Sequence, residues 1–252
     1  MRVIAYSWNA GEETGHSHAV SMPFFPAIPK TISAIVPALN ESLAIGETLR
    51  RLSGIPEICE VIVADGGSRD GTQEIARSHG CNVIESPRGR GRQMRAGALL
   101  ARGDVVLLCH ADTWLPAEAG REALACFDEA GVVAGGFWKE FRDPTWIMRG
   151  QRLKAWVRLR LGRRIMGDQA MFLPRTVLEQ IGSVPDVPLM EEFIMCRALA
   201  KLGKLRLANA TVTTSGRRFR EKGALRTYAL MWSVMLRYHL GATPEELVRR
   251  YR

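Results

Sequence analysis

The sequence predicts an α/β protein whose central sheet is mostly parallel and flanked by helices. Three apolar runs without polar alternation are typical of strands that are covered on both faces; they are Thr31 to Val36, Val61 to Ala64 and Val105 to Cys109. Each run leads into a short polar cluster that contains an acid. Because the carboxyl ends of parallel strands meet at one edge, where open α/β sheets bind ligands, these clusters indicate a site for a phosphorylated ligand with a metal.

Strand-like and helix-like segments alternate from residue 30 onward, which favours a parallel sheet with right-handed crossovers. The expected elements besides the three strands are helices over Glu41 to Leu52, Thr72 to His79, the later part of Gly89 to Leu100, Pro116 to Ala130, Glu191 to Lys201 and Ala224 to Leu240, with strands at Val83 to Ile84 and Val132 to Phe141. Turn residues separate most of these segments. The basic stretch Trp146 to Leu161 has no clean period.

Positive charge is in excess and unevenly placed. The 252 residues contain 35 Lys and Arg against 26 Asp and Glu, which gives a net charge of +9 at pH 7. Phe141 to Arg164 hold eight basic residues and one Asp, and Arg217 to Arg252 hold nine basic residues and three Glu, so the rest of the chain is close to neutral or slightly acidic. We therefore expect anionic partners: nucleotides, nucleic acid or an acidic membrane surface.

The chain is expected to have three parts. Residues 1–30 predict a loosely ordered tail, because Ser21 to Lys30 carries three prolines; residues 31–215 predict one α/β domain; and residues 216–252 predict a basic helical segment packed on that domain or on a membrane surface. There is no apolar run of signal-peptide or membrane-spanning length, and the five cysteines form no CxxC pair. We expect a cytoplasmic protein, with peripheral contact at the inner face of the membrane left open.

Five segments in order resemble the glycosyltransferases of family 2, which have the GT-A nucleotide-diphospho-sugar fold. The segments are SAIVPALNE (Ser33 to Glu41), VIVADGGSRDGT (Val61 to Thr72), GDVVLLCHADTWLP (Gly103 to Pro116), MGDQAMFLPR (Met166 to Arg175) and PLMEEFIMCRALAKLGKL (Pro188 to Leu205). The chain is most similar to small stand-alone bacterial members with HADT where larger relatives carry DxD. The resemblance covers about 30 to 240 and implies that residues 31–215 form a catalytic domain. Two positions depart from the family pattern: His110 replaces the first acid of DxD, and Glu192 replaces an Asp.

The resemblance implies a nucleotide-sugar pocket at the ends of the first strands. Its residues are Pro37, Ala38, Asn40, Glu41, Asp65, Gly67, Arg92, Gln93, His110 and Ala111. The residue types agree, because an Asn and acids at strand ends can pair with a base or ribose hydroxyls, and glycines allow close backbone approach. Two alternatives concern capping: Asn40 could cap the next helix, and capping is the preferred interpretation of Asp70.

The segment Pro87 to Arg95 places four arginines around two glycines just before a helix. Guanidinium groups and backbone N–H groups there could bind a diphosphate, and Arg92 is the arginine expected to stabilise the leaving group. A nucleic-acid patch and a solvated basic loop are the alternatives. No aromatic residue occurs between Val83 and Leu108 for base stacking, so we expect no nucleic-acid partner.

Asp112 is the predicted metal ligand. A lone carboxylate at a strand end can bind Mg or Mn together with phosphate oxygens of a substrate. His110 could contribute to this region or be a hydrogen-bonded neutral histidine.

The pair Glu191 and Glu192 opens a predicted helix, and the family pattern makes Glu192 the general base, with Glu191 and Asp168 as further catalytic candidates. We expect a like-charged neighbour to raise the pKa of Glu192, and expect the second carboxylate to cap the helix or to pair with a basic neighbour such as Arg217 or Arg218. The resemblance places Gln169, Arg217 and Arg218 on the acceptor side of the cleft.

The function expected from these observations is an inverting, metal-assisted glycosyltransferase that moves a sugar from a nucleotide-diphosphate donor to a hydroxyl acceptor, which the sequence does not identify. Two alternatives stay open. A nucleotidyltransferase would carry a glycine-rich basic loop directly after the first strand, where this chain has PALNESLAIG. A non-catalytic basic module that binds membrane or nucleic acid is favoured by the loss of the first DxD acid.

Overall fold

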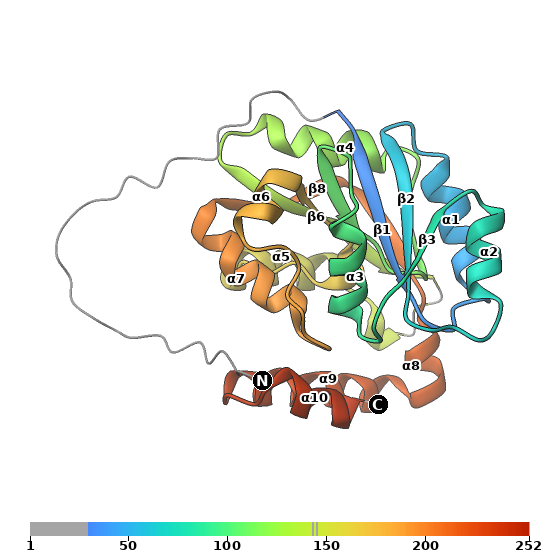
Figure 1. The fold of residues 1–252 in the computed structure, drawn as a ribbon. Helices are drawn as coiled ribbons and strands as arrows, with labels where there is room; N and C mark the ends of the chain where they lie inside the picture. The colour runs from blue at the N-terminus through green and yellow to red at the C-terminus, as the bar shows by residue number, and fades with distance from the viewer. Residues whose placement is uncertain (1–29, 143, 145, 252) are drawn as a thin grey trace, which may run out of the picture.

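One curled sheet forms the centre of the computed structural model, which describes residues 30–142, 144 and 146–251 (Figure 1). Within those residues the sheet has eight strands in the order β3-β2-β1-β4-β7-β6-β8-β5. Their bounds are β1 Ile32–Ala38, β2 Ile58–Asp65, β3 Asn82–Glu85, β4 Val105–Leu108, β5 Thr113–Trp114, β6 Val132–Phe141, β7 Met171–Pro174 and β8 Lys204–Thr214. The expected tail, except for Lys30, lies outside the described residues.

The sheet has a parallel half and a mixed half. Strands β3, β2, β1 and β4 are parallel neighbours, as the apolar runs predict. Strand β7 then pairs antiparallel with both β4 and β6, β6 pairs parallel with β8, and β5 pairs antiparallel with β8. The prediction of a mostly parallel sheet therefore describes the first half better than the second.

Helices cover both faces of the sheet. Helices α1 Ile45–Ser53, α2 Thr72–Ser78 and α4 Ala119–Ala125 pack on one face, and α3 Arg90–Ala98, α6 Arg175–Gln180 and α7 Glu191–Leu202 pack on the other. Along β1, Val36 and Ile35 point to opposite faces and join the two cores. Such burial explains why these strands lack polar alternation.

Several helices differ from the prediction. Helix α4 is shorter than the predicted Pro116 to Ala130, and α3 begins at Arg90 rather than in the later part of Gly89 to Leu100. Helix α1 begins at Ile45 rather than at Glu41, because Asn40 has a left-handed φ of 55° and the N–H of Ser42 donates to Asp70 instead of continuing a helix. Helix α5 spans Gln151–Gly162, where the sequence shows no period. It buries only Gln151 and Ala155. With so few buried positions the helix does not need apolar residues every three to four positions, and the sequence therefore shows no helical period.

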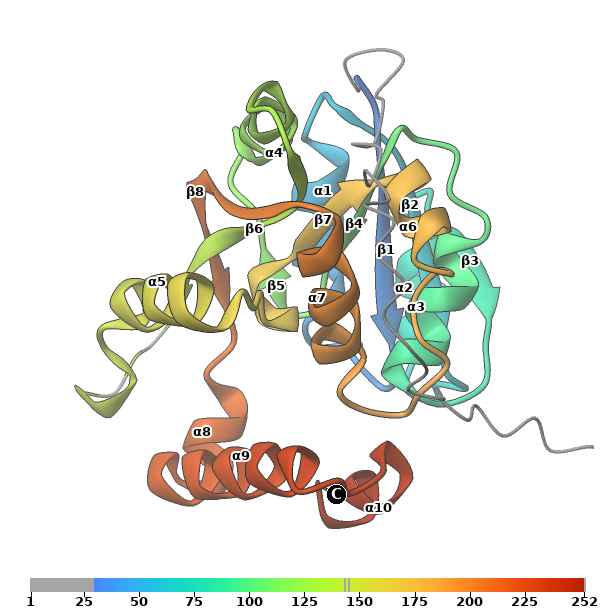
Figure 2. The same cartoon turned by 90° about the vertical axis from the view of Figure 1, so that its left-hand side faces the viewer.

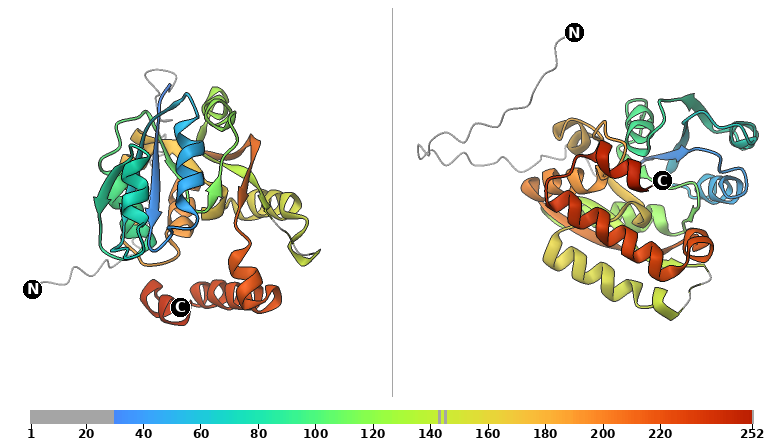
Figure 3. Two further views of the ribbon diagram at one scale, coloured as in Figure 1. Left: turned by 90° about the vertical axis from the view of Figure 1, so that its right-hand side faces the viewer. Right: turned by 90° about the horizontal axis from the view of Figure 1, so that it is seen from below.

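The C-terminal segment forms α8 Arg217–Lys222, α9 Ala224–His239 and α10 Pro244–Tyr251. These helices lie beneath the edge at which β1 ends (Figure 2), and from below they lie in front of part of the sheet, with the blue strand β1 visible beside them (Figure 3). Val234 and Leu247 pack against Leu189 and Phe193, so the inner side of the segment contacts the rest of the protein. Whether 216 marks a domain boundary stays a prediction. Among the described residues, no helix combines the length and apolarity needed to cross a membrane.

A close approach at Gly91 joins α3 to the loop that precedes α7. A Cβ atom at this position would lie 2.4 Å from the carbonyl oxygen of Val187 and 2.8 Å from that of Pro185. Only glycine allows this spacing without movement of the backbone. The contact brings the first turn of α3 to the first turn of α7, where the functional groups described next are found.

Candidate active site

Two cavities meet at the carboxyl ends of β1 and β4. The strand-end cavity, with a volume of about 520 Å³, lies among Pro37, Ala38, Ala111 and the start of α3. The helix-side cavity, about 240 Å³, lies between the start of α7 and helices α8 and α9. Arg90, His110 and Asp112 line both cavities. The structure therefore brings three polar side chains to the junction of two spaces that could hold two different ligands.

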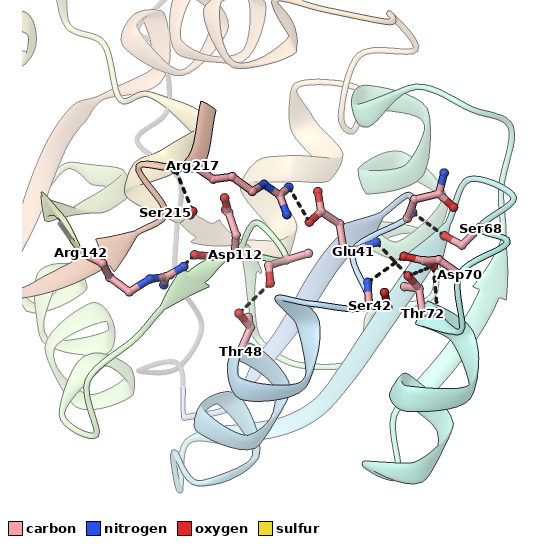
Figure 4. Close-up of polar contacts among 12 residues, drawn as sticks. Glu41, Ser42, Thr48, Ser68, Asp70, Thr72, Asp112, Arg142, Ser215 and Arg217 are labelled. Atoms are coloured by element: carbon pink, nitrogen blue, oxygen red, sulfur yellow. Dashed lines mark hydrogen bonds and ion pairs between the residues drawn. The ribbon is translucent and has the colours of Figure 1, made fainter. Parts of the chain in front are cut away.

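The loop after β1 is fixed to the loop after β2. The backbone N–H of Asn40 donates to Ser68 at 2.9 Å, and the side-chain oxygen of Asn40 accepts from the N–H of Arg69 at 2.9 Å. Asn40 therefore does not cap α1, whose N-cap is Ala44. Asp70 accepts from Thr72 at the start of α2, as expected, and also from Ser42, so it joins the two loops (Figure 4).

Glu41 lines the strand-end cavity and forms an ion pair with Arg217 at 3.2 Å (Figure 4). Burial raises the pKa of Glu41, although the guanidinium of Arg217 lowers it in part. This ion pair connects α8 to the first strand end. Arg217 thus lies beside a residue expected to bind the nucleotide, whereas the side chain of Arg218 is outside what the structure describes.

Asp65 is fully buried and organises the second loop. Its Oδ1 accepts from the N–H groups of Gly67 and Ser68 and from the amide of Gln73 at 2.8–2.9 Å. Burial alone would raise the pKa of Asp65, but these hydrogen bonds outweigh it and lower the pKa. Its Oδ2 has no hydrogen-bond partner among the described residues, but Asp65 lines neither cavity, so the structure shows it ordering the loop rather than bordering the predicted nucleotide pocket. Gly67 has a φ of 90°, the left-handed conformation that the turn requires.

Gln93 holds the two strand ends together. Its amide nitrogen donates to the carbonyl oxygens of Ala38 at 2.6 Å and Ala64 at 2.9 Å. The side chain is 4% exposed yet borders the strand-end cavity. Its donors are directed to the backbone, so its role in this structure is to set the spacing of β1 and β2.

Asp112 lies beyond the end of β4 with its side chain directed toward Glu41 and Arg217 (Figure 4). Two contacts fix the backbone beside it: Arg142 donates to the carbonyl oxygen of Asp112 at 3.0 Å, and Thr48 donates to that of Ala111 at 2.7 Å. The guanidinium of Arg142 also stacks 3.7 Å from the ring centre of Trp114. These contacts leave the carboxylate of Asp112 at the junction of the cavities.

His110 carries a shielded nitrogen without a hydrogen-bond partner among the described residues, Nε2. Burial lowers the pKa of His110, and the charge of Arg90 lowers it further, more than Asp112 and other acids raise it. The imidazole is therefore neutral at neutral pH and its Nε2 can accept or bind a cation. Gly167 makes room for it, because a Cβ there would lie 2.9 Å from Nε2.

Arg90 binds both acids of the α7 pair. Its Nη2 lies 2.7 and 2.9 Å from the two carboxylate oxygens of Glu192, and its Nε donates to Glu191. The side chains of Glu191 and Glu192 are only 1% and 11% exposed. The second carboxylate, Glu191, pairs with a basic neighbour as predicted, but this neighbour is Arg90 rather than Arg217 or Arg218, because Gly91 allows α3 to approach α7.

The two carboxylates titrate in opposite directions. Burial raises the pKa of Glu191 to about 7. Burial would also raise the pKa of Glu192, but the charge of Arg90 and further hydrogen bonds lower it below its usual value. The prediction that Glu191 raises the pKa of Glu192 is therefore wrong, because Glu191 is the carboxylate that keeps its proton. Glu192, which faces the helix-side cavity, is an ionised carboxylate.

Asp168 also lines the helix-side cavity, but it forms an ion pair with Lys139 at 2.5 Å. Burial would raise the pKa of Asp168, and the charge of Lys139 outweighs this effect and lowers it. Gln169 lies beneath the same turn and lines neither cavity. It is 1% exposed, and its amide bonds Phe137 and Met166 at 3.0 Å, so it supports Asp168 rather than the expected acceptor side.

The described chain matches the family model "Glycosyl transferase family 2" over residues 33–180. The chain belongs to glycosyl transferase family 2. The match covers four of the five segments on which the resemblance is based, while the fifth, Pro188 to Leu205 with Glu191 and Glu192, lies beyond it.

Curated relatives agree with this family. An uncharacterized glycosyltransferase of Escherichia coli (strain K12) is 27% identical over 61% of this chain and 38% of its own length. A Drosophila melanogaster dolichyl-phosphate beta-glucosyltransferase is 31% identical over 50% of this chain and 43% of its own length. This chain therefore spans well under two thirds of the length of both relatives.

Solved structures of similar fold include a mannosyltransferase and a protein in complex with a nucleotide sugar. The mannosyltransferase PcManGT from Pyrobaculum calidifontis, in complex with GDP-Man and Mn²⁺, has a TM-score of 0.60 at 19% identity and covers 90% of this chain and 70% of that one. S. aureus TarS 1-349 in complex with UDP-GlcNAc has a TM-score of 0.59 at 18% identity and covers 73% of this chain and 58% of that one. These similarities confirm the predicted GT-A fold.

The family 2 chain places its arginines differently from the sequence prediction. Arg92 pairs with Asp186 at 2.9 Å and is 43% exposed, whereas Arg88 and Arg90 line the strand-end cavity. The prediction from the sequence singles out Arg92 from this group of arginines. The signal for Arg90 was its position between Gly89 and Gly91, two residues that permit close packing on either side. Arg142 and Lys139, which hold Asp112 and Asp168, had no signal in the sequence.

We predict that Glu191→Gln removes one component of the pH dependence of stability. A folded-state pKa near 7 exceeds the usual 4.5, so the folded chain holds a proton that the unfolded chain has already lost. This contribution is fully present below pH 4.5 and is lost as the pH rises through 7. The free energy of unfolding, measured in urea, should fall between pH 5.5 and pH 8 in the unaltered protein. In the variant this fall should be smaller by roughly 1 kcal/mol or more.

The matched control for this measurement is Glu74→Gln, at an exposed position in α2. That variant should keep the pH slope of the unaltered chain. An equal slope in Glu191→Gln and the unaltered chain would contradict the assignment of the shared proton to Glu191.

Proposed function

We propose that this protein transfers a sugar from a nucleotide-diphosphate donor to an acceptor oxygen, with inversion at the anomeric carbon. The observation that supports this most is the ionised Glu192 in the helix-side cavity, paired with Arg90, a residue that this cavity shares with the strand-end cavity. The strand-end cavity is the proposed donor site, with Pro37, Ala38 and Glu41 around the nucleotide and Asp65 ordering the neighbouring loop. Structural neighbours that hold GDP-Man or UDP-GlcNAc support a donor of this class.

In the proposed reaction the acceptor oxygen attacks the anomeric carbon from the helix-side cavity. The bond between that carbon and the diphosphate oxygen breaks, the diphosphate leaves with the bonding electrons, and the acceptor proton passes to Glu192. A single displacement of this kind inverts the centre. Glu192 is the best candidate for the base because Lys139 pairs with Asp168 and Glu191 does not line the cavity.

Positive charge near the leaving diphosphate comes from Arg88 and Arg90, which line the donor cavity. Such preorganised charge stabilises the transition state without rearrangement of solvent. We therefore assign to Arg88 and Arg90 the role that the sequence suggested for Arg92.

The residues at the junction fit a divalent cation, Mg²⁺ or Mn²⁺. Asp112 supplies a carboxylate, and His110 has an unpartnered Nε2 two residues away. The described residues contain no cluster of three His, Cys, Asp or Glu suited to a metal, so diphosphate oxygens and water would complete the ligand shell. When bound, the ion would neutralise charge on the departing diphosphate. PcManGT and related structures with Mn²⁺ support this assignment.

The C-terminal segment is proposed to contact an anionic membrane peripherally. Leu225, Trp232, Leu236 and Leu240 on the outer side of α9 are each at least 60% exposed, and they recur at intervals that place them on one helix face. Exposed Arg226 and Arg237 lie beside them. An apolar stripe flanked by cations suits a helix that lies in the interface of an anionic leaflet.

The donor prediction uses a thermal-shift panel of nucleotide diphosphates and nucleotide sugars with and without Mn²⁺. A ligand of the folded state raises the melting temperature by mass action. We expect a hit that strengthens with Mn²⁺, and Asp112→Asn should lose the metal-dependent part in calorimetry while keeping its fold. Undiminished metal dependence in the variant would reject Asp112 as the ligand.

The base prediction is that Glu192→Gln lowers turnover by roughly a hundredfold or more, the usual effect of losing acid–base catalysis. Release of nucleotide diphosphate from the donor found in the panel measures turnover, and donor affinity should change little. Glu191→Gln and Asp168→Asn are the matched variants. If one of them loses turnover while Glu192→Gln keeps it, the role of base belongs to that residue.

The membrane prediction is co-sedimentation with anionic vesicles at low salt and release at high salt, because a Debye length of about 3 Å at 1 M salt screens the arginines. Trp232→Glu should weaken sedimentation several-fold. Leu100→Glu, at an exposed position just after α3, is the control and should not. Absence of sedimentation at low salt would contradict membrane contact.

A further inference from the structure

The helix-side cavity has an apolar wall and a charged floor. Its floor carries Glu192, Asp168 and the residues shared with the donor cavity. Its wall is built largely from the facing sides of α7, α8 and α9, and includes Phe193, Phe219, Met231, Val234 and Met235. Reacting groups are thus collected at one end of a space whose sides are hydrocarbon.

The few hydroxyl groups on the wall already have partners within the protein. Thr227 donates to the carbonyl oxygen of Gly223 at 2.8 Å, Ser215 accepts from the N–H of Arg217 at 3.1 Å, and Thr214 is 3.4 Å from the hydroxyl of Thr113. A saccharide acceptor brings many hydroxyls, each of which loses water on entering and needs a new partner. An apolar chain has no such requirement and gains free energy from burial.

Helix α9 connects this wall to the outer surface. Met231, Val234 and Met235 face the cavity, whereas Trp232, Leu236 and Leu240 on the other side of the same helix are exposed. The cavity, about 240 Å³, is smaller than the roughly 300 Å³ or more typical of a site for a whole drug-sized ligand. Only the first part of a long chain would fit, and the remainder would leave past α9 toward its exposed apolar side.

We infer that the acceptor is an amphipathic lipid, whose reacting oxygen, in a hydroxyl or a phosphate, is carried at the end of a long apolar chain. The head would lie beside Glu192, the first part of the chain between α7 and α9, and the rest in the lipid surface against which α9 lies. This inference rests on the proposed function and names the substrate class of its second cavity.

The test compares probes with one head group and different chains. Isopentenyl phosphate and farnesyl phosphate, below its aggregation concentration, are titrated by calorimetry into the full chain with Mn²⁺ and the nucleotide diphosphate found in the panel. Burial of only two more methylene groups corresponds to roughly a tenfold gain in affinity. We expect farnesyl phosphate to bind at least about tenfold more tightly, and affinities within about threefold would overturn the inference.

Two variants locate the chain. Met231→Gln and Met235→Gln should each reduce the affinity for farnesyl phosphate by roughly tenfold and leave that for isopentenyl phosphate unchanged. The reason is that a polar amide loses its water without gaining a partner when the longer lipid chain packs against it. Leu236→Gln, 60% exposed on the outer side of α9, is the matched control and should bind as the unaltered chain does. Equal losses in Leu236→Gln would overturn the placement in the cavity.

Nucleotide binding separates the two possible failures. If the protein binds the nucleotide diphosphate but shows no preference for a longer lipid chain, the lipid acceptor alone is rejected. If the protein binds no nucleotide, the proposed function itself is rejected. Farnesol is the remaining probe. Tight binding of farnesol supports a hydroxyl head, and tight binding only of farnesyl phosphate supports a phosphate head; weak binding of both overturns the inference.

Discussion

The ion cluster of Arg90 with Glu191 and Glu192 is the interaction on which the arrangement of the site depends. Two buried carboxylates share one guanidinium, so the cluster has one positive charge for two acids. Removing that cation would leave both acids buried without a counter-charge, which is strongly destabilising. The imbalance is resolved by a proton on Glu191, whose pKa is about 7, and this leaves Glu192 ionised and open to the helix-side cavity. One arginine thus anchors α7 and sets the charge of the residue suited to act as a base.

The backbone on both sides of this ion cluster has unusual geometry. Met190, directly before the two acids, has a left-handed φ of 70°, a conformation that costs a non-glycine residue about 1–3 kcal/mol. Gly91 accepts the opposite loop at a spacing that no side chain would permit. The ion cluster and the packing of Phe193 against α9 offset the strain at Met190. A strained residue held next to buried charge is typical of a functional site rather than of a simple turn.

The sequence predicts what is local and misses what depends on distant contacts. Strand β6 was predicted at Val132 to Phe141, the bounds observed, because both faces of that strand are largely buried and its composition shows it. The start of α1 was missed because Asp70, 28 residues away, takes the N–H of Ser42. Arg90 was not preferred over Arg92 for the same reason: four arginines in one segment look alike until α3 meets α7. Gln169 was assigned to the acceptor side from the family pattern, but its buried amide bonds Phe137.

The C-terminal helices contribute to both halves of the site. Arg217 in α8 pairs with Glu41 at the donor cavity, while Met231 and Val234 in α9 line the other cavity. Movement of this segment would therefore alter the donor loop and the apolar wall together. The basic residues of the segment lie on two sides in the same way. Arg217 forms an ion pair within the site, whereas Arg226 and Arg237 are exposed beside apolar side chains. A segment that was recognisable in the sequence only by its net charge thus has two sides, one that completes the reaction centre and one suited to a lipid surface.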